Sequence, residues 1–210
     1  MVYADAGCVL NLEPPAARAR LGDYLEQADR HGISFMQQRH VEERWSKADT
    51  MDRIGLAPAD RRSGQYLAGV LVLRSTSTTI DLVDAWLALC EEDDHRFLDD
   101  RPGRVPDAVD FREHRHDQAI LSGLAKRADV PAIADETAHR PHWATEGASS
   151  PIWCARHRWG AAFVPQGGPG MRLVPERLLD RAERAAVGLR SRSSPSRGGA
   201  GATARGGDED

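Results

Sequence analysis

Three short stretches of this sequence carry residue types that could do chemistry, and the first begins at Asp5. This carboxylate follows an apolar segment and precedes Ala6 and Gly7. A carboxylate at the carboxyl end of a strand lies where open α/β sheets bind ligands, and a glycine lets a phosphate or a metal ion approach the backbone. Aspartate before Ala-Gly is also an ordinary turn residue, so Asp5 is a candidate metal ligand with a structural alternative.

The second stretch is a polar cluster over residues 111–118 that leads into a helical pattern and contains His116, Asp117 and Gln118. An imidazole beside a carboxylate could bind a divalent cation or position an acceptor hydroxyl. The structural alternative is that Asp117 complements the helix dipole and that the neighbouring histidines and arginines are exposed. The metallo-hydrolase pattern HxHxDH is not matched, because Asp117 falls one position early and no histidine follows it.

The third stretch, residues 64–69, reads GQYLAG and precedes an aliphatic run. The amide of Gln65 offers both a donor and an acceptor to a polyhydroxylated ligand, while Ala68 and Gly69 permit close approach of that ligand. The structural alternative is the entry of a strand with a bulge.

The elements that must position these stretches alternate between strand and helix patterns. Residues 1–4 predict a short buried strand that enters the Asp5 turn. The other predicted strands cover residues 33–37, 63–73 and 130–134. The predicted helices cover residues 15–31, 78–90, 116–128 and 175–189, with one or two short surface helices within 42–54. The helix over 78–90 is expected to have an apolar side formed by Ile80, Val83, Trp86, Leu87 and Cys90.

Composition and charge exclude several classes of protein. The 210 residues are 40% apolar and 29% charged, which suits one domain with a core, over residues 1–189, and a disordered tail over 190–210. No apolar run is long enough for an integral membrane segment. The 28 Lys and Arg are balanced by 32 Asp and Glu, which disfavours a nucleic-acid partner.

Cysteine usage adds an expectation about the cellular compartment. Cys8, Cys90 and Cys154 are odd in number and far apart, so the sequence predicts neither a disulfide framework nor a CxxC metal site. The first residues show no pattern of a secretory signal. A reducing, cytoplasmic location is therefore expected.

The order of four segments carries a family resemblance. VYADAGC, ERWSKADTMDRIG, GQYLAGVLVLR and FREHRHDQAILSGLAKR, taken in this order, resemble bacterial glycosyltransferases of the GT-A, nucleotide-diphospho-sugar transferase type. The resemblance covers residues 2–127, with weaker support to residue 158. It implies an α/β fold with an incomplete GT-A, Rossmann-like mixed sheet flanked by helices. The chain begins at the Asp5 strand, so the nucleotide-binding part that precedes this motif in the family is expected to be missing.

The resemblance also implies roles for individual residues. Asp5 matches the position that holds Mn²⁺ or Mg²⁺ and the diphosphate, although Asp5-Ala6-Gly7 supplies one carboxylate where the family's DxD supplies two. The sugar and acceptor wall matches Gln65, Ala68 and Gly69, and the motif beside the reacting carbon matches His116, Asp117 and Gln118. His116 and Asp117 would be the catalytic residues.

The implied substrates are a nucleotide-diphosphate sugar and a glycan or other hydroxyl acceptor, as in polysaccharide biosynthesis. Without the nucleotide-binding part, weak or absent transferase activity is expected. The alternative is a non-catalytic remnant that binds a glycan or a partner protein.

Overall fold

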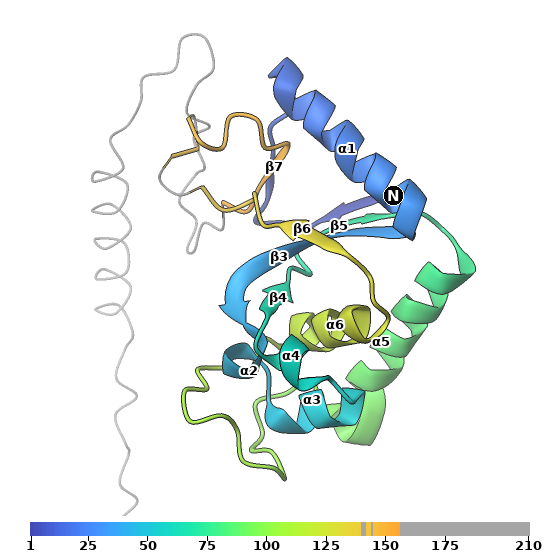
Figure 1. The fold of residues 1–210 in the computed structure, drawn as a ribbon, viewed down its shortest axis with the longest axis vertical. Coiled ribbons are helices and arrows are strands. Elements are labelled where there is room, and N and C mark those ends of the chain that lie inside the picture. Colours follow the sequence, from blue (N-terminus) through green and yellow to red (C-terminus); the bar gives the residue numbers. More distant parts are fainter. Residues whose placement is uncertain (140–141, 144, 156–210) are drawn as a thin grey trace, which may run out of the picture. The chain divides into compact units, whose positions relative to one another are not determined.

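Strand β3 (Ile33–Val41) is the element on which the sheet is built in this computed structural model, which describes residues 1–139, 142–143 and 145–155. Strands β4 (Gly64–Tyr66) and β5 (Val70–Leu73) pair antiparallel with β3, and β6 (Ala132–Ala134) pairs parallel with it. Strand β1 (Val2–Ala4) pairs antiparallel with β5. The predicted α/β class is confirmed: the sheet is mixed, and helices flank it (Figure 1).

The predicted single strand over 63–73 is wrong, because it is interrupted at residues 67–69. Both halves still lie along one edge of β3, with Tyr66 opposite Gln37 and Leu73 opposite Ile33. At the interruption the carbonyl oxygen of Gly69 accepts a hydrogen bond from the backbone N–H of Asp5. The Gly69 carbonyl at this break is therefore a backbone partner of Asp5, the residue that follows β1 and begins the turn.

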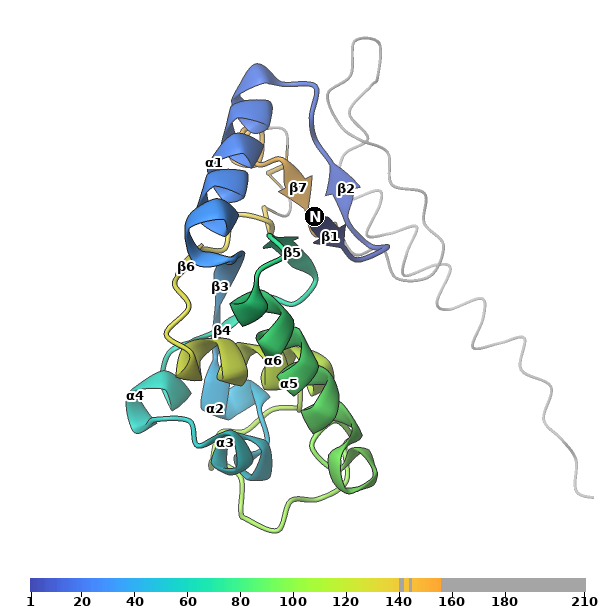
Figure 2. The same cartoon turned by 90° about the vertical axis from the view of Figure 1, so that its right-hand side faces the viewer.

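Helices cover both faces of this sheet. Helix α1 (Pro15–His31) lies on one face, and α5 (Ser77–His95) and α6 (His116–Arg127) lie on the other (Figures 1 and 2). Proline at the first helical position and Gly32 in a left-handed conformation bound α1 as its sequence predicts. Strand β5 alternates accordingly: Val70 and Val72 pack in the cluster that contains α1, and Leu71 and Leu73 pack in the cluster that contains α6.

Shorter elements complete the described unit. They are α2 (Glu42–Trp45), α3 (Ala48–Ile54) and α4 (Pro58–Arg61), and a two-stranded sheet of β2 (Val9–Leu10) and β7 (Ile152–Trp153). None of the described helices is both long enough and apolar enough to cross a membrane. The predicted helix over 175–189, the end of the predicted domain at residue 189 and the predicted tail lie outside the described residues.

Residues 42–54 form two short helices as predicted, but the prediction that these helices lie at the surface is wrong for several of their side chains. Glu42 and Thr50 are fully buried, and Lys47 and Asp49 are nearly so. The carboxylate of Asp49 accepts hydrogen bonds from the backbone of Arg104 and Val105, far along the chain. Charged side chains are buried here because distant residues supply their hydrogen-bond partners.

Two further predictions about burial are wrong. Strand β1 is an edge strand whose Val2 and Tyr3 are exposed, because it has a neighbour on one side only among the described strands. On α5, Ile80, Val83 and Leu87 are exposed, whereas the other two predicted residues, Trp86 and Cys90, pack against the core beside Leu82 and Leu89. Strand β3 also runs four residues beyond its predicted end at residue 37.

Candidate functional site

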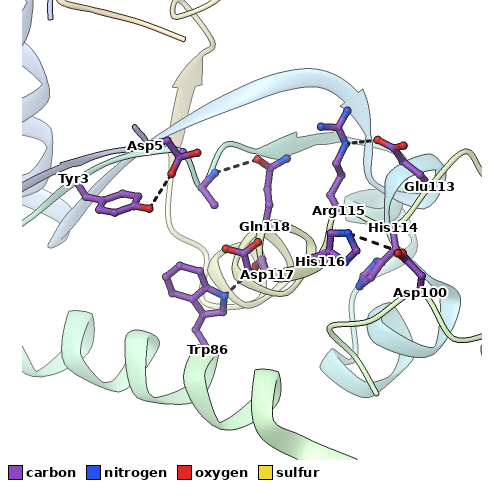
Figure 3. A pocket seen from close by; sticks show the side chains of 12 residues that line it. Tyr3, Asp5, Trp86, Asp100, Glu113, His114, Arg115, His116, Asp117 and Gln118 are labelled. Carbon is purple, nitrogen blue, oxygen red and sulfur yellow. Dashed lines mark hydrogen bonds and ion pairs between the residues drawn. The ribbon is translucent and has the colours of Figure 1, made fainter. Parts of the chain in front are cut away.

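Six of the seven predicted site residues line one cavity of about 490 Å³. They come from three places: the end of β1, the break between β4 and β5, and the first turn of α6 (Figure 3). The six are Asp5, Ala68, Gly69, His116, Asp117 and Gln118. The volume lies within the range of small-molecule binding sites.

Hydrogen bonds to its side chain and its backbone hold Asp5 in place. Its Oδ1 accepts a hydrogen bond from the Tyr3 hydroxyl at 2.8 Å, and its backbone N–H donates to Gly69 at 2.9 Å. The Asp5 carbonyl accepts from the N–H of Cys8, which closes the turn. The pKa of Tyr3 is raised by the hydrogen bond to Asp5 and by its charge, with a smaller contribution from the charge of Asp117. The negative charges of Asp5 and Asp117 therefore both act on the Tyr3 hydroxyl.

Gly69 leaves room for this carboxylate. A Cβ at position 69 would lie 2.8 Å from Oδ2 of Asp5, closer than real Cβ contacts. We expect Gly69→Ala to displace the Asp5 side chain and, through the loss of its hydrogen bond to Tyr3, to lower the free energy of unfolding by about 0.5–1.5 kcal/mol. Urea denaturation measures the stability, and the titration of Tyr3 followed by ultraviolet absorbance reports the loss of its bond to Asp5.

The matched control for this substitution is Gly22→Ala in α1, where a Cβ would meet nothing within 4 Å. Alanine is the better helix former, so this variant should be about 0.5–1 kcal/mol more stable than the parent. Equal stability of the two alanine variants would show that Gly69 does not serve as a spacer for Asp5.

The start of α6 places His116 and Asp117 in the cavity. His116 has a φ of +48°, a left-handed conformation that a residue with a side chain seldom adopts. Its Nδ1 is 2.8 Å from the Leu98 carbonyl oxygen, so Nδ1–H donates, and its Nε2 lies 3.9 Å from a carboxylate oxygen of Asp100. The half-exposed imidazole is thus anchored at one nitrogen and faces the cavity with the rest of its ring.

Trp86 and Tyr3 line the same cavity, although sequence reasoning did not select them. The Nε1–H of Trp86 donates to the backbone carbonyl of Asp117 at 2.9 Å, which fixes the indole beside that carboxylate (Figure 3). Helical spacing predicts Trp86 on the apolar side of its helix, and this spacing alone does not indicate that the side chain lines a cavity. For Tyr3, the alternation along β1 places its side chain on the same face as Asp5, two residues later.

Gln65, the seventh predicted residue, is fully buried and does not line the cavity. Its Oε1 accepts a hydrogen bond from Nε2 of Gln118 at 2.6 Å. Gln118 in turn donates to Gln38 and accepts from the backbone N–H of Ala68. Gln65 is therefore a positioning residue behind Gln118, in place of the direct substrate contact that was expected for it.

A buried ion pair supports this amide chain from behind. The Glu42 carboxylate, with no exposed surface, lies 2.6 Å from Nζ of Lys126 and accepts hydrogen bonds from Ser122 and Ser46. Nε2 of Gln65 donates to the same carboxylate at 3.0 Å. Helices α2 and α6 and strand β4 thus share one charged network behind the cavity wall.

His114 lies at the cavity wall but is almost completely buried. Its Nδ1 accepts from the backbone N–H of Lys47, so Nε2 carries the proton and donates to the Phe97 carbonyl oxygen at 2.8 Å. Burial lowers the pKa of His114 to about 4, the hydrogen bond to Phe97 opposes this shift, and the charge of Lys47 adds to it. His114 is a neutral structural histidine that joins α3 to the segment after α5.

The lowered pKa of His114 predicts a pH dependence of stability. Between pH 6.5 and about pH 4 the unfolded chain binds a proton here that the folded protein does not, so stability falls as the pH falls through this window. The loss should reach about 3 kcal/mol at the acid end. Urea denaturation at several pH values measures it.

The comparison for this experiment is His114→Gln. The glutamine cannot titrate, so its stability should depend less on pH in this window. His40, whose pKa burial also lowers, contributes in the same direction to both proteins. Identical pH slopes for parent and variant would contradict the assignment.

The charges around the cavity are mainly negative. Four carboxylates line it, from Asp5, Asp100, Glu113 and Asp117. Arg115 is the one Lys or Arg among the described lining residues; its guanidinium lies over the Trp45 ring and 3.2 Å from Glu113. An anionic ligand would therefore need a cation to enter near Asp5.

No group of three or more His, Cys, Asp or Glu side chains that could hold a metal ion occurs among the described residues. Asp5, the residue predicted at the metal position, would therefore be a single carboxylate ligand. Magnesium is often bound by one or two carboxylates together with the phosphates of a substrate. The site fits a divalent cation that arrives with a phosphate-bearing ligand, and it does not fit a preformed metal centre.

These features define a class: an α/β protein with a mixed sheet and an acidic, aromatic-lined cavity where β1 ends beside α6. Comparison with protein-family models, with curated proteins and with solved structures finds no match to this chain.

Proposed function

We propose that this chain is a glycosyltransferase-like protein of the GT-A type that binds a nucleotide-diphosphate sugar and a hydroxyl acceptor in this cavity. One observation carries the proposal: Asp5, Gly69 and Asp117, from three distant segments, line a single cavity. These three segments are among the four that carry the family resemblance of the sequence. If either Asp5 or the start of α6 did not line the cavity, the proposal would lose its basis.

The position of Asp5 within the sheet also supports the proposal. Asp5 directly follows β1, whose carboxyl end lies at the rim of the cavity beside Gly69. Ligands of open α/β sheets bind outside the carboxyl ends of strands. The diphosphate of the donor would lie here, where Gly69 adds no side chain.

A divalent cation would be held by Asp5 and by the diphosphate oxygens, as the single carboxylate requires. When bound, Mn²⁺ or Mg²⁺ neutralises the leaving diphosphate. The four cavity carboxylates make this neutralisation necessary, because an uncompensated diphosphate would be repelled. At the other end of the cavity, the Arg115 guanidinium is turned toward Glu113 and stacked on Trp45, so we do not assign it to the diphosphate (Figure 3).

The transfer breaks the bond between the anomeric carbon and the diphosphate oxygen and forms a bond from that carbon to the acceptor oxygen. The acceptor proton passes to a base, and Asp117 is the candidate for this role or for stabilising the positive charge on the sugar ring. His116, anchored through Nδ1, would hold a sugar hydroxyl. Gln118 orients the wall residue Ala68 through the hydrogen bond between them.

A second function, glycan binding without catalysis, is favoured by the aromatic lining. Trp86 and Tyr3 flank the carboxylates, and the indole is fixed by its hydrogen bond to Asp117. Aromatic faces beside polar groups that accept hydroxyl hydrogens suit a sugar ring. This function needs neither a nucleotide nor a metal ion.

Calorimetry separates the two functions. UDP, GDP, CDP and dTDP are titrated in turn into the protein, each with Mn²⁺ and with EDTA, and cellohexaose and maltohexaose are titrated without nucleotide. The transferase proposal expects one diphosphate to bind with Mn²⁺ and to lose its binding in EDTA. Oligosaccharide binding with no response to any nucleotide would replace it with the glycan-binding function.

A further inference from the structure

Two cysteines far apart in the sequence meet at the small sheet of the described unit. The Sγ atoms of Cys8 and Cys154 are 3.5 Å apart, across 146 residues of chain. Cys8 directly precedes β2 and Cys154 directly follows β7. The pairing of these strands, with Val9 opposite Trp153, places the two cysteines opposite each other one residue beyond the sheet.

The hydrogen-bond pattern identifies the kind of pair that they form. The N–H of Asn11 donates to the carbonyl of Pro151, so this pair is hydrogen-bonded, and alternation makes Cys8 and Cys154 a non-hydrogen-bonded pair. Their own N–H groups donate elsewhere, to Asp5 and Thr137. Residues in such pairs have Cα atoms about 4.5 Å apart, within the range that a disulfide spans.

Neither cysteine is completely covered by its surroundings. Both thiols are half-buried, and the Cys8 thiol also contacts the Gly69 carbonyl oxygen at 3.8 Å. The hydrogen bond to Cys8 and burial raise the pKa of Cys154. The third cysteine, Cys90, is not part of this pair, because it lies on α5. Burial raises the pKa of its thiol to about 11.

We infer that Cys8 and Cys154 are a modification site that forms an intramolecular disulfide with a low-molecular-weight disulfide such as oxidised glutathione. The thiolate of one cysteine attacks one sulfur of the reagent, a mixed disulfide forms, and the first glutathione leaves as a thiolate. The other cysteine loses its proton to solvent, and its thiolate attacks the protein sulfur of the mixed disulfide, which releases the second glutathione as a thiolate. Two protein thiols are oxidised and one reagent disulfide is reduced to two thiols.

The crosslink would act on the fold and on the cavity rim. It closes a loop from residue 8 to residue 154 that contains the whole five-stranded sheet except β1, which restricts the unfolded chain. It also ties the turn that carries Asp5 to the segment after β7. This inference uses no part of the proposed transferase function.

The test is oxidation of the full chain with oxidised glutathione, followed by alkylation and peptide mapping without reductant. We expect reactive thiols to fall from three to one, a peptide linking Cys8 to Cys154, and a melting temperature higher by about 5 °C or more. The parent protein alone suffices for the mapping, so the test does not depend on the folding of any variant.

Three serine variants provide the matched controls. Cys90→Ser should keep both the crosslink and the rise in melting temperature, whereas Cys8→Ser and Cys154→Ser should lose both. The inference is overturned if the folded protein leaves Cys8 and Cys154 alkylatable after oxidation. Mixed disulfides or intermolecular dimers through these cysteines, with no linked peptide, would overturn it equally.

Discussion

Replacement of Lys126 by methionine is expected to destabilise the protein by about 3–5 kcal/mol. The ammonium group lies 2.6 Å from the Glu42 carboxylate, and both side chains are almost completely buried. Methionine keeps most of the packing volume and removes the charge, so Glu42 is left as a buried carboxylate without its counter-charge. The free energy of unfolding from urea denaturation measures the effect.

Two comparisons isolate the ion pair in this experiment. The double variant Glu42→Gln, Lys126→Met removes both charges and should recover part of the loss, because no unpaired buried charge remains. Arg30→Met breaks the exposed pair with Glu26 on α1 and should change stability by less than about 1 kcal/mol. A double variant that is less stable than Lys126→Met would show that the network matters through its hydrogen bonds more than through the charge pair.

Replacement of Asp5 by asparagine is expected to weaken Mn²⁺-dependent binding of a nucleoside diphosphate by at least about 100-fold. The reason is the composition of the site: Asp5 is the one carboxylate assigned to the metal ion, and the amide of asparagine is a much poorer ligand for it. Asparagine retains the size of the side chain and an acceptor for the Tyr3 hydroxyl. Calorimetric titration of the diphosphate that binds the parent, with Mn²⁺ present, gives the ratio of dissociation constants.

The control for Asp5→Asn is Asp23→Asn, which removes the same charge from the exposed side of α1. Its diphosphate affinity should stay within about twofold of the parent, because surface charges at a distance are screened by salt. A metal-dependent affinity that survives in Asp5→Asn would remove Asp5 from the metal site and, with it, the main support for the transferase proposal.

Local patterns in the sequence were sufficient for several elements, among them two that carry the candidate site. Pro15 and Gly32 bound α1, and the apolar spacing after His116 predicted α6 within one residue at its end. Asp5 followed a predicted strand, and the structure places that strand in the sheet. These features depend on neighbours within about four residues, so the sequence expresses them directly.

Interactions between distant residues decided the rest. Glu42 reads as a surface charge because its partner, Lys126, lies 84 residues away. Gln65 reads as a ligand contact because its buried partners Glu42 and Gln118 lie 23 and 53 residues away. At the break between β4 and β5, the Gly69 carbonyl oxygen accepts a hydrogen bond from the N–H of Asp5, a partner 64 residues away that no pattern local to residues 67–69 could indicate. No helical spacing could assign Trp86 to a cavity formed by β1 and α6.

By itself, the sequence determined the α/β class, most of the elements and the three stretches that meet at the cavity. Tertiary structure alone decided which side chains face that cavity, which charges are buried and that Cys8 lies against Cys154. The physical reason is that burial and hydrogen-bond satisfaction depend on atoms brought together by folding, whereas periodicity and capping depend on the adjacent turns of the chain.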